Sequence, residues 1–282
     1  MYSIIQAILQ AVFEILPISE SAHSSAFHEF AGSADGTCSA LTGVIHMAIA
    51  IGIFGASYNI FMKLGKEFFA TFTDIAGKRI KGSEKRPARM FMYETLIAFA
   101  PMILWLIPFG KAGLLYTVLH RSSYNGTLLD EGVFMFITGG VIIATAKQIS
   151  LSRNDKGITP QFALFSGFVL LFAIPVAGFS IIGVMFSMLI LLGVSRRPAL
   201  RFALVTAAPV YFVLGIVEMC IGTKIGFFSG LLAAVIGVVV SFVAVRVLRY
   251  MIKNKFFRYF GIYDAGVGFI FAVVGIFQLA LR

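Results

Sequence analysis

The sequence predicts an all-α polytopic membrane protein, with six transmembrane helices and two re-entrant helical hairpins in an inverted-topology repeat. Three observations lead to this prediction: the composition, the lengths of the apolar runs and the placement of the basic residues. Of the 282 residues, 59% are hydrophobic and only 13% are charged, and the mean hydropathy is +0.93. A water-soluble domain has about 25% charged residues, so this chain lacks the polar surface that such a domain needs.

The apolar runs have the length of membrane spans. A helix needs about 20 apolar residues to cross the hydrocarbon core, and six runs come close to this length: 40–62, 90–109, 133–149, 203–221, 227–246 and 262–280. Two further apolar stretches, 2–30 and 161–195, are interrupted by Pro17 and Pro175. The stretch 2–30 is too short for two full spans, which favours a re-entrant hairpin. The alternative, in which each interrupted stretch crosses the membrane as two helices, agrees equally well with the charges.

The basic residues set the topology. The chain has 23 Lys and Arg against 13 Asp and Glu, a formal net charge of +10. Most basic residues fall in four connecting segments, 63–89, 147–156, 194–201 and 246–258, which the positive-inside rule places in the cytoplasm. Anionic lipid head groups explain such a distribution, so no nucleic-acid partner is expected.

The two halves of the chain follow the same plan. Each half has an interrupted hairpin followed by three spans, and an odd number of spans turns the second copy upside down. We therefore predict one membrane domain made of a first repeat, 1–150, and a second, inverted repeat, 151–282. Interrupted segments at equivalent places in such repeats point to a site near the membrane midplane. The two cysteines, Cys38 and Cys220, lack CxxC spacing and indicate no metal or redox site.

Ionisable residues gather in the first hairpin. Gln10 and Glu14 are four residues apart and share one face of a helix, and Pro17 ends or kinks that helix. A carboxylate at membrane depth costs several kcal/mol unless it is paired or hydrated. No Lys or Arg precedes this run, so we expect it to be part of the mature fold and not a signal peptide.

The segment after Pro17 reads Ser19-Glu20-Ser21-Ala22-His23 and adds hydroxyls, a carboxylate and an imidazole. Two carboxylates can hold a divalent cation, and the cation can in turn hold phosphate oxygens. A histidine beside them can act as a nucleophile or as a general acid–base. The structural alternative is that Ser19 or Ser21 caps a helix and that His23 lies at the outer interface.

At these residues the sequence resembles the undecaprenyl-pyrophosphate phosphatase family of the bacitracin-resistance type. The first family motif is Glu/Gln-x-x-x-Glu followed by Pro-x-Ser-Ser-x-x-His. Gln10, Glu14 and the run from Pro17 to His23 match it, with Glu20 in place of the second serine. The resemblance extends over the whole length and includes the plan of a hairpin followed by three spans.

The second family motif is Pro-Gly-x-Ser-Arg-Ser-Gly-x-Thr, followed by Gly-x-Ser-Arg. The residues that match it are Gly178, Ser180, Gly183, Gly193, Ser195 and Arg196. The arginine, the following serine and the threonine of the motif are Ile181, Ile182 and Met185 here. The Tyr-Arg pair that the family often has in its last span is Tyr263-Asp264.

The resemblance implies a multi-pass enzyme of the bacterial plasma (inner) membrane. Such an enzyme dephosphorylates undecaprenyl pyrophosphate at the outer face, recycles the lipid carrier of peptidoglycan synthesis and influences bacitracin resistance. Its cofactor would be Mg²⁺ or Ca²⁺, and a homodimer is compatible with it. The implied catalytic residues are His23, Glu14 and Glu20, the implied metal ligands are Glu14 and Glu20, and the implied substrate-binding residues are Gln10, Ser19, Ser21, Ser180 and Gly178.

The missing arginine at Ile181 leaves a second hypothesis open. A bidentate phosphate ligand contributes several kcal/mol at a transition state, so its loss argues for weak or absent hydrolysis. The chain would then be a catalytically impaired paralogue that binds or translocates polyprenyl phosphate. A secondary transporter of small solutes shares the repeat plan but has no motif in its favour.

Overall fold

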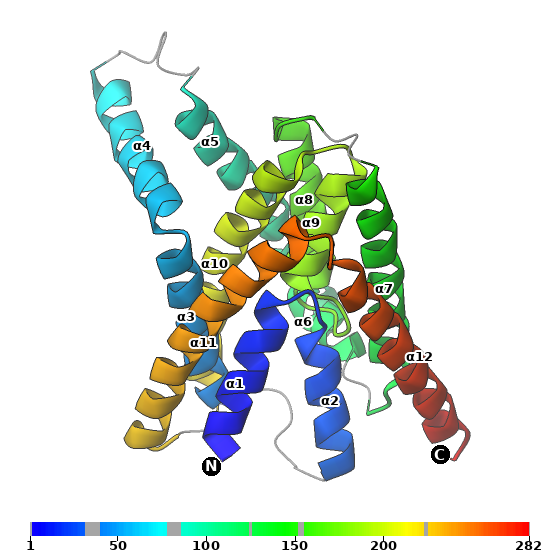
Figure 1. Cartoon of the computed structure of the whole chain (residues 1–282). Helices are drawn as coiled ribbons and strands as arrows, with labels where there is room; N and C mark the ends of the chain where they lie inside the picture. Colours follow the sequence, from blue (N-terminus) through cyan, green and yellow to red (C-terminus); the bar gives the residue numbers. More distant parts are fainter. Residues whose placement is uncertain are drawn as a thin grey trace.

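The structure is a computed structural model of the chain, and it describes residues 2–31, 40–77, 86–123, 126–151, 155–222 and 225–281. Cys38 and residues 78–85 of the first basic segment lie outside the described residues. Within the described residues every regular element is a helix (Figure 1). The prediction of an all-α multi-pass membrane protein is confirmed.

The helices follow one another along the chain with short connections. The α-helices are α1 (Tyr2–Ile15), α2 (Glu20–Ala31), α3 (Ala40–Ala56), α4 (Tyr58–Ala76), α5 (Pro87–Phe99), α6 (Leu115–Ser123), α7 (Leu129–Ser150), α8 (Pro160–Ala173), α9 (Ile181–Leu191), α10 (Arg196–Ile221), α11 (Phe227–Lys253) and α12 (Arg258–Ala280), and the 3-10 helices are η1 (Ala100–Leu106) and η2 (Gly110–Ala112). Five helical segments are long and apolar enough to cross a membrane: Pro87–Leu106, Leu129–Ser150, Arg196–Ile221, Phe227–Lys253 and Arg258–Ala280. A sixth is present if α3 and α4 are counted as one span.

The run 40–62, which we predicted as one of six spans, is broken into two helices. The axis turns by 91° between α3 and α4, at Ser57. Arg249 of α11 stabilises the break: its Nη1 donates to the Ala56 carbonyl at 2.8 Å and its Nη2 to Ser57 Oγ at 2.7 Å. A side chain that satisfies a carbonyl freed from the helix ladder is a recognised cause of a sharp kink.

The two predicted hairpins are pairs of short helices whose turns meet inside the molecule. The first pair is α1–α2, with Pro17 in its turn, and the second is α8–α9, with Pro175 in its turn. The open end of α1–α2 lies on the side of both chain termini, whereas α10, which follows the second pair, begins on the opposite side (Figure 1). At the meeting point, a Cβ added to Gly183 would lie only 2.7 Å from the Cβ of Pro17. The division of the chain at residue 150 stays a prediction.

Close backbone packing fixes the helices around the hairpins. Along the contact of α7 with α12, glycines let the two backbones touch, and a Cβ at Gly139 would lie 2.3 Å from the Ala265 nitrogen. The crossing of α3 and α10 is equally close, since a Cβ at Gly43 would lie 2.7 Å from the Gly215 carbonyl oxygen. Small residues at helix crossings are how membrane helices pack without a hydrophobic driving force. These two crossings position the polar residues described next.

Candidate functional site

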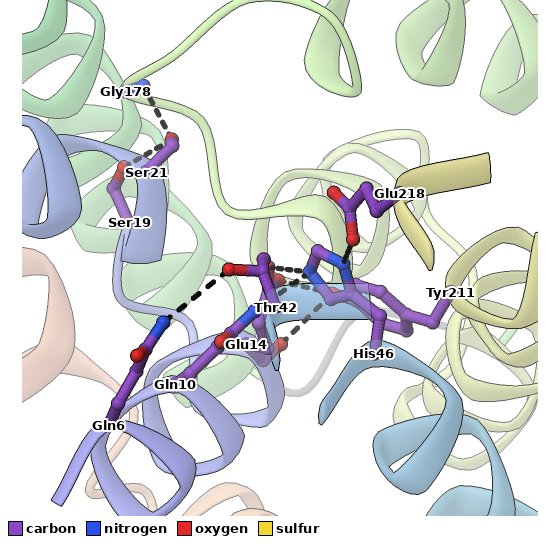
Figure 2. Close-up of polar contacts among 10 residues, drawn as sticks. All are labelled: Gln6, Gln10, Glu14, Ser19, Ser21, Thr42, His46, Gly178, Tyr211 and Glu218. Carbon is purple, nitrogen blue, oxygen red and sulfur yellow. Dashed lines mark hydrogen bonds and ion pairs between the residues drawn. The ribbon is translucent and has the colours of Figure 1, made fainter. Parts of the chain in front are cut away.

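A buried polar cluster surrounds His46 of α3 (Figure 2). Its Nδ1 lies 2.6 Å from Glu218 Oε2 of α10, and its Nε2 lies 3.2 Å from Glu14 Oε1 of α1. The other oxygen of Glu14 accepts a hydrogen bond of 2.6 Å from the Tyr211 hydroxyl. The side chains of His46, Glu14 and Glu218 are only 8%, 12% and 16% exposed. Three helices from both halves of the chain therefore share one charged cluster.

The protonation of His46 Nε2 determines whether the ring forms a hydrogen bond with Glu14 or with Gln10, both of α1. Gln10 Nε2 also lies 3.2 Å from this ring nitrogen. A protonated Nε2 donates to the Glu14 carboxylate, whereas a bare Nε2 accepts from the Gln10 amide. In the second state the ring is neutral, Nδ1 still donates to Glu218, and Glu14 Oε1 is released.

A second group of contacts lies at the turn of the first hairpin, toward α12. The Ser19 carbonyl oxygen lies 2.6 Å from His23 Nδ1, and the Tyr263 hydroxyl lies 2.8 Å from His23 Nε2. The imidazole also packs on Phe13, with 4.7 Å between ring centroids. The Gly178 N–H of the second hairpin donates to Ser21 Oγ at 3.0 Å (Figure 2). This bond connects the two hairpin turns.

The two groups face different helices. Glu14 points to α3 and α10, whereas His23 points to α12, and no described contact joins the two side chains directly. Glu20, the first residue of α2, interacts electrostatically with Glu14, His46 and Glu218. Glu20 is therefore within electrostatic range of the His46 cluster, and the other predicted site residues form two neighbouring groups.

The serines combine a structural role with their predicted one. Ser19 is fully buried, and its hydroxyl accepts from the Ala22 N–H at 3.3 Å, so it caps α2 as the structural alternative expected. Ser180 caps α9 in the same way, accepting from the Gly183 N–H at 3.2 Å. Gly178 has φ of +100°, which only glycine adopts without strain. Its carbonyl oxygen lies 3.4 Å from Thr138 Oγ1. The roles of these residues in binding a substrate stay predictions.

The positions of the missing motif residues are buried and apolar. Ile181, Ile182 and Met185 are 7%, 1% and 0% exposed and belong to the main hydrophobic core. The first turn of α9 therefore offers no side-chain cation to a phosphate.

The oxygen atoms near Glu14 fit a hard divalent cation in their chemistry. Gln10 Oε1 is buried and has no hydrogen-bond partner among the described residues. Glu14 shares the contact with His46 Nε2, and Glu20 interacts electrostatically with Glu14. Amide and carboxylate oxygens are the ligands that Mg²⁺ and Ca²⁺ prefer. The described residues contain no group of three or more His, Cys, Asp or Glu arranged to hold a metal ion. Cation binding would thus use the Gln10 amide and the neutral state of His46, in which Glu14 Oε1 is released.

Our reading of the sequence missed His46, Tyr211 and Glu218. The signal for two of them was present, because an ionisable residue inside an apolar run is costly and marks a site. His46 lies within the run 40–62 and Glu218 within the run 203–221. Averaging hydropathy over each run concealed them.

The sequence of the chain matches that of a known protein family. The family described as "Bacitracin resistance protein BacA" matches residues 3–270. A protein named undecaprenyl-diphosphatase from Alkaliphilus metalliredigens is 26% identical over 281 residues, which cover 95% of this chain and 96% of the relative. Proteins of the same name from Methanobrevibacter smithii and Leuconostoc citreum are 25% and 27% identical, and the matches cover at least 95% of each chain. The chain therefore belongs to the bacitracin resistance protein BacA family.

Proposed function

We propose that this protein hydrolyses undecaprenyl pyrophosphate to undecaprenyl phosphate and inorganic phosphate, as a multi-pass enzyme of the bacterial plasma membrane. The observation that carries the proposal is the hydrogen bonding of His23. A backbone carbonyl can only accept, so the contact of 2.6 Å with the Ser19 carbonyl requires the hydrogen to be on Nδ1. Nε2 of the neutral ring then has a free lone pair, to which the Tyr263 hydroxyl donates at 2.8 Å. Nε2 is the atom suited to attack phosphorus or to take a proton from water.

Hydrolysis of the diphosphate needs water as its only co-reactant. Water adds across the phosphoanhydride, the P–O bond to the terminal phosphate breaks, and the lipid keeps one phosphate. His23 Nε2 would replace its contact with Tyr263 by a contact with the terminal phosphate or with the attacking water. When bound, Mg²⁺ or Ca²⁺ would neutralise charge on the diphosphate. Gln10, Glu14 and Glu20 would hold the cation.

The position of the first hairpin supports a reaction at the outer face. Its open end lies on the side of both chain termini (Figure 1). α10 runs from the basic residue Arg196 to Ile221, and α11 runs back from Phe227 to the basic residue Lys253. The basic ends of the two helices therefore lie on the same side of the protein. The positive-inside rule favours a cytoplasmic location of the basic ends, and the first hairpin would then open to the outside.

The test is phosphate release from undecaprenyl pyrophosphate by purified protein with Mg²⁺. We expect release by the wild type and none by His23→Ala. The matched control is Gly140→Ala, a change at a position where an added Cβ meets nothing within 4 Å. Wild-type release no greater than that of His23→Ala would overturn the proposal.

A second candidate function rests on the apolar start of α9. Because Ile181 occupies the position of the family arginine and is buried, a phosphate at this place loses its bidentate partner. The protein would then bind or translocate polyprenyl phosphate without hydrolysing the diphosphate. Proteoliposomes that move or bind labelled polyprenyl phosphate but release no phosphate from the diphosphate would favour this function.

A further inference from the structure

A second polar cavity lies away from the His46 cluster, between the break of α3–α4 and the basic ends of α10 and α11. Its volume is about 1070 Å³. Five cationic side chains line it: Arg196, Arg197, Arg201, Arg249 and Lys253. None of its lining residues is Asp or Glu. A cavity with this much uncompensated charge is suited to an anion.

One guanidinium in the cavity is held in place before any ligand arrives. Arg249 donates to the Ala56 carbonyl at 2.8 Å and to Ser57 Oγ at 2.7 Å. Ser57 is 6% exposed and accepts this bond, so its own hydroxyl hydrogen can point to a ligand oxygen. A fixed guanidinium with a neighbouring hydroxyl matches the geometry of a phosphate group.

The cations repel one another across the cavity. Arg249 is half-buried and interacts unfavourably with Arg201, which also lines the cavity, and with Arg246, which lies outside it. Among the described residues, no Asp or Glu forms an ion pair with Arg196, Arg201 or Arg249. An anion between these side chains would remove the repulsion, and the gain would appear as binding affinity.

The backbone adds to the attraction for an anion. α10 begins at Arg196 and has no acidic residue in its first turn. The preceding residue, Ser195, makes no side-chain hydrogen bond to the helix. The N–H groups of this first turn and the helix dipole therefore favour negative charge at the same place as the arginines.

The remaining lining is apolar and identifies the kind of anion. Ile60, Ile149, Leu200, Leu204 and Ile252 share the cavity with the cations. Its volume is that of sites for drug-sized molecules, and a free phosphate ion would leave most of it empty. Cationic groups beside apolar walls match a phosphate attached to hydrocarbon. Basic pockets between membrane helices bind lipid head groups in this way.

We propose that this cavity binds the phosphate head group of an anionic membrane lipid, at the end of the protein opposite to the open end of the first hairpin. The site is separate from Glu14 and His23, and the proposal does not depend on hydrolysis at the first hairpin. The arginines bind the phosphate of the head group, and the apolar residues contact the start of the lipid chains.

The test measures lipid binding to the purified full-length protein. The probes are short-chain phosphatidic acid, phosphatidylcholine of the same chain length, and inorganic phosphate, followed by native mass spectrometry or by the shift in melting temperature. We expect phosphatidic acid to bind best, and Arg201→Gln to weaken it by about tenfold or more, since a charge-assisted bond is lost. The matched control is Arg246→Gln on α11, because Arg246 stacks 4.6 Å from the Phe242 ring centroid and does not line the cavity. This control should change the affinity by less than about twofold.

The other possible binding results would contradict the proposal. Equal affinity for inorganic phosphate and for phosphatidic acid would overturn the assignment to a lipid and leave a free-anion site. Equal affinity for phosphatidylcholine, or an unchanged affinity in Arg201→Gln, would overturn the site itself. If Arg201→Gln lowers the melting temperature without lipid, Arg197→Gln replaces it, because Arg197 is exposed and also lines the cavity.

Discussion

Replacing His46 by leucine tests whether the charged cluster holds the two halves of the protein together. The substitution removes the partner of Glu218 at 2.6 Å and of Glu14 at 3.2 Å, and leucine fills a similar volume. Removing one partner of a buried ion pair costs about 3–5 kcal/mol. The side chains of Glu14 and Glu218 are only 12% and 16% exposed, so solvent does little to reduce this cost.

An upper limit follows from protonation of a released carboxylate. A carboxyl group of ordinary pKa, about 4.3, takes up a proton at pH 7 at a cost of about 3.7 kcal/mol. Tyr211 still donates to Glu14, so Glu218 is the carboxylate that is left unpaired when His46 is removed. We therefore expect the free energy of unfolding to fall by about 3–3.7 kcal/mol, which corresponds to a melting temperature about 6–15 °C lower.

The pH dependence has a defined sign. We expect a carboxylate left unpaired in folded His46→Leu to take up a proton on folding at pH 7, and in that case the stability of this variant decreases as the pH rises. At pH 5 the same protonation costs only about 1 kcal/mol, and most of the deficit should disappear. The assay is the fraction of protein that stays monodisperse in size-exclusion chromatography after heating, at both pH values.

Two further variants make the test specific. Gln6→Leu removes a hydrogen bond of 3.4 Å to Thr42 between the same two helices and should cost less than about 1 kcal/mol. The double variant His46→Leu/Glu218→Leu should recover stability relative to His46→Leu, because an apolar pair is better than one unpaired carboxylate. A His46→Leu protein that melts within 2 °C of the wild type, or that has the same deficit at both pH values, would refute the reasoning.

Five other outcomes follow from the structure. Tyr263→Phe removes the hydroxyl that occupies His23 Nε2 before the substrate binds, so the rate of phosphate release should stay unchanged or rise by up to about fivefold, the effect of about 1 kcal/mol. Ser21→Ala leaves the Gly178 N–H without its bond and should lower the free energy of unfolding by about 1–3 kcal/mol in thermal melts. Gly139→Ala places a Cβ 2.3 Å from the Ala265 nitrogen and should destabilise by about 1–3 kcal/mol. Its neighbour Gly140→Ala meets nothing within 4 Å and should melt at or above the wild-type temperature. EDTA should abolish phosphate release, Mg²⁺ or Ca²⁺ should restore it in the wild type, and the absence of restoration in Glu14→Gln would support the assigned cation ligands.

The sequence contains most of what decides the helical elements, because the causes are local. Pro17 and Pro175 interrupt their apolar stretches wherever the rest of the chain lies, so both hairpin turns could be predicted. The break at Ser57 could not, since it is stabilised by Arg249, which is 192 residues further along the chain. No local pattern announces a partner that distant.

The residues that the first hairpin contributes to the candidate site could be predicted, but their partners on other helices could not. Gln10 and Glu14 share a helix face by their spacing, and both do contact His46. The identity of that partner depends on the close crossing of α3 with α10 at Gly43 and Gly215, which spacing along one helix does not define. For the same reason, Tyr263 could be read as a departure from the family pattern but not as the neighbour of His23.

The glycines between α7 and α12 have a consequence for how variants of this protein should be understood. Tyr263 reaches His23 from α12, two residues beyond Gly261, whose own Cβ position would lie 2.8 Å from the Gly139 carbonyl oxygen. Because the main chains of α7 and α12 are in direct contact, the two helices cannot accommodate an added methyl group without moving apart. A substitution there would tilt the phenol away from the imidazole while leaving every reactive group chemically intact. A changed activity in such a variant would report the altered position of the phenol, so the glycines set the spacing at the proposed reaction centre.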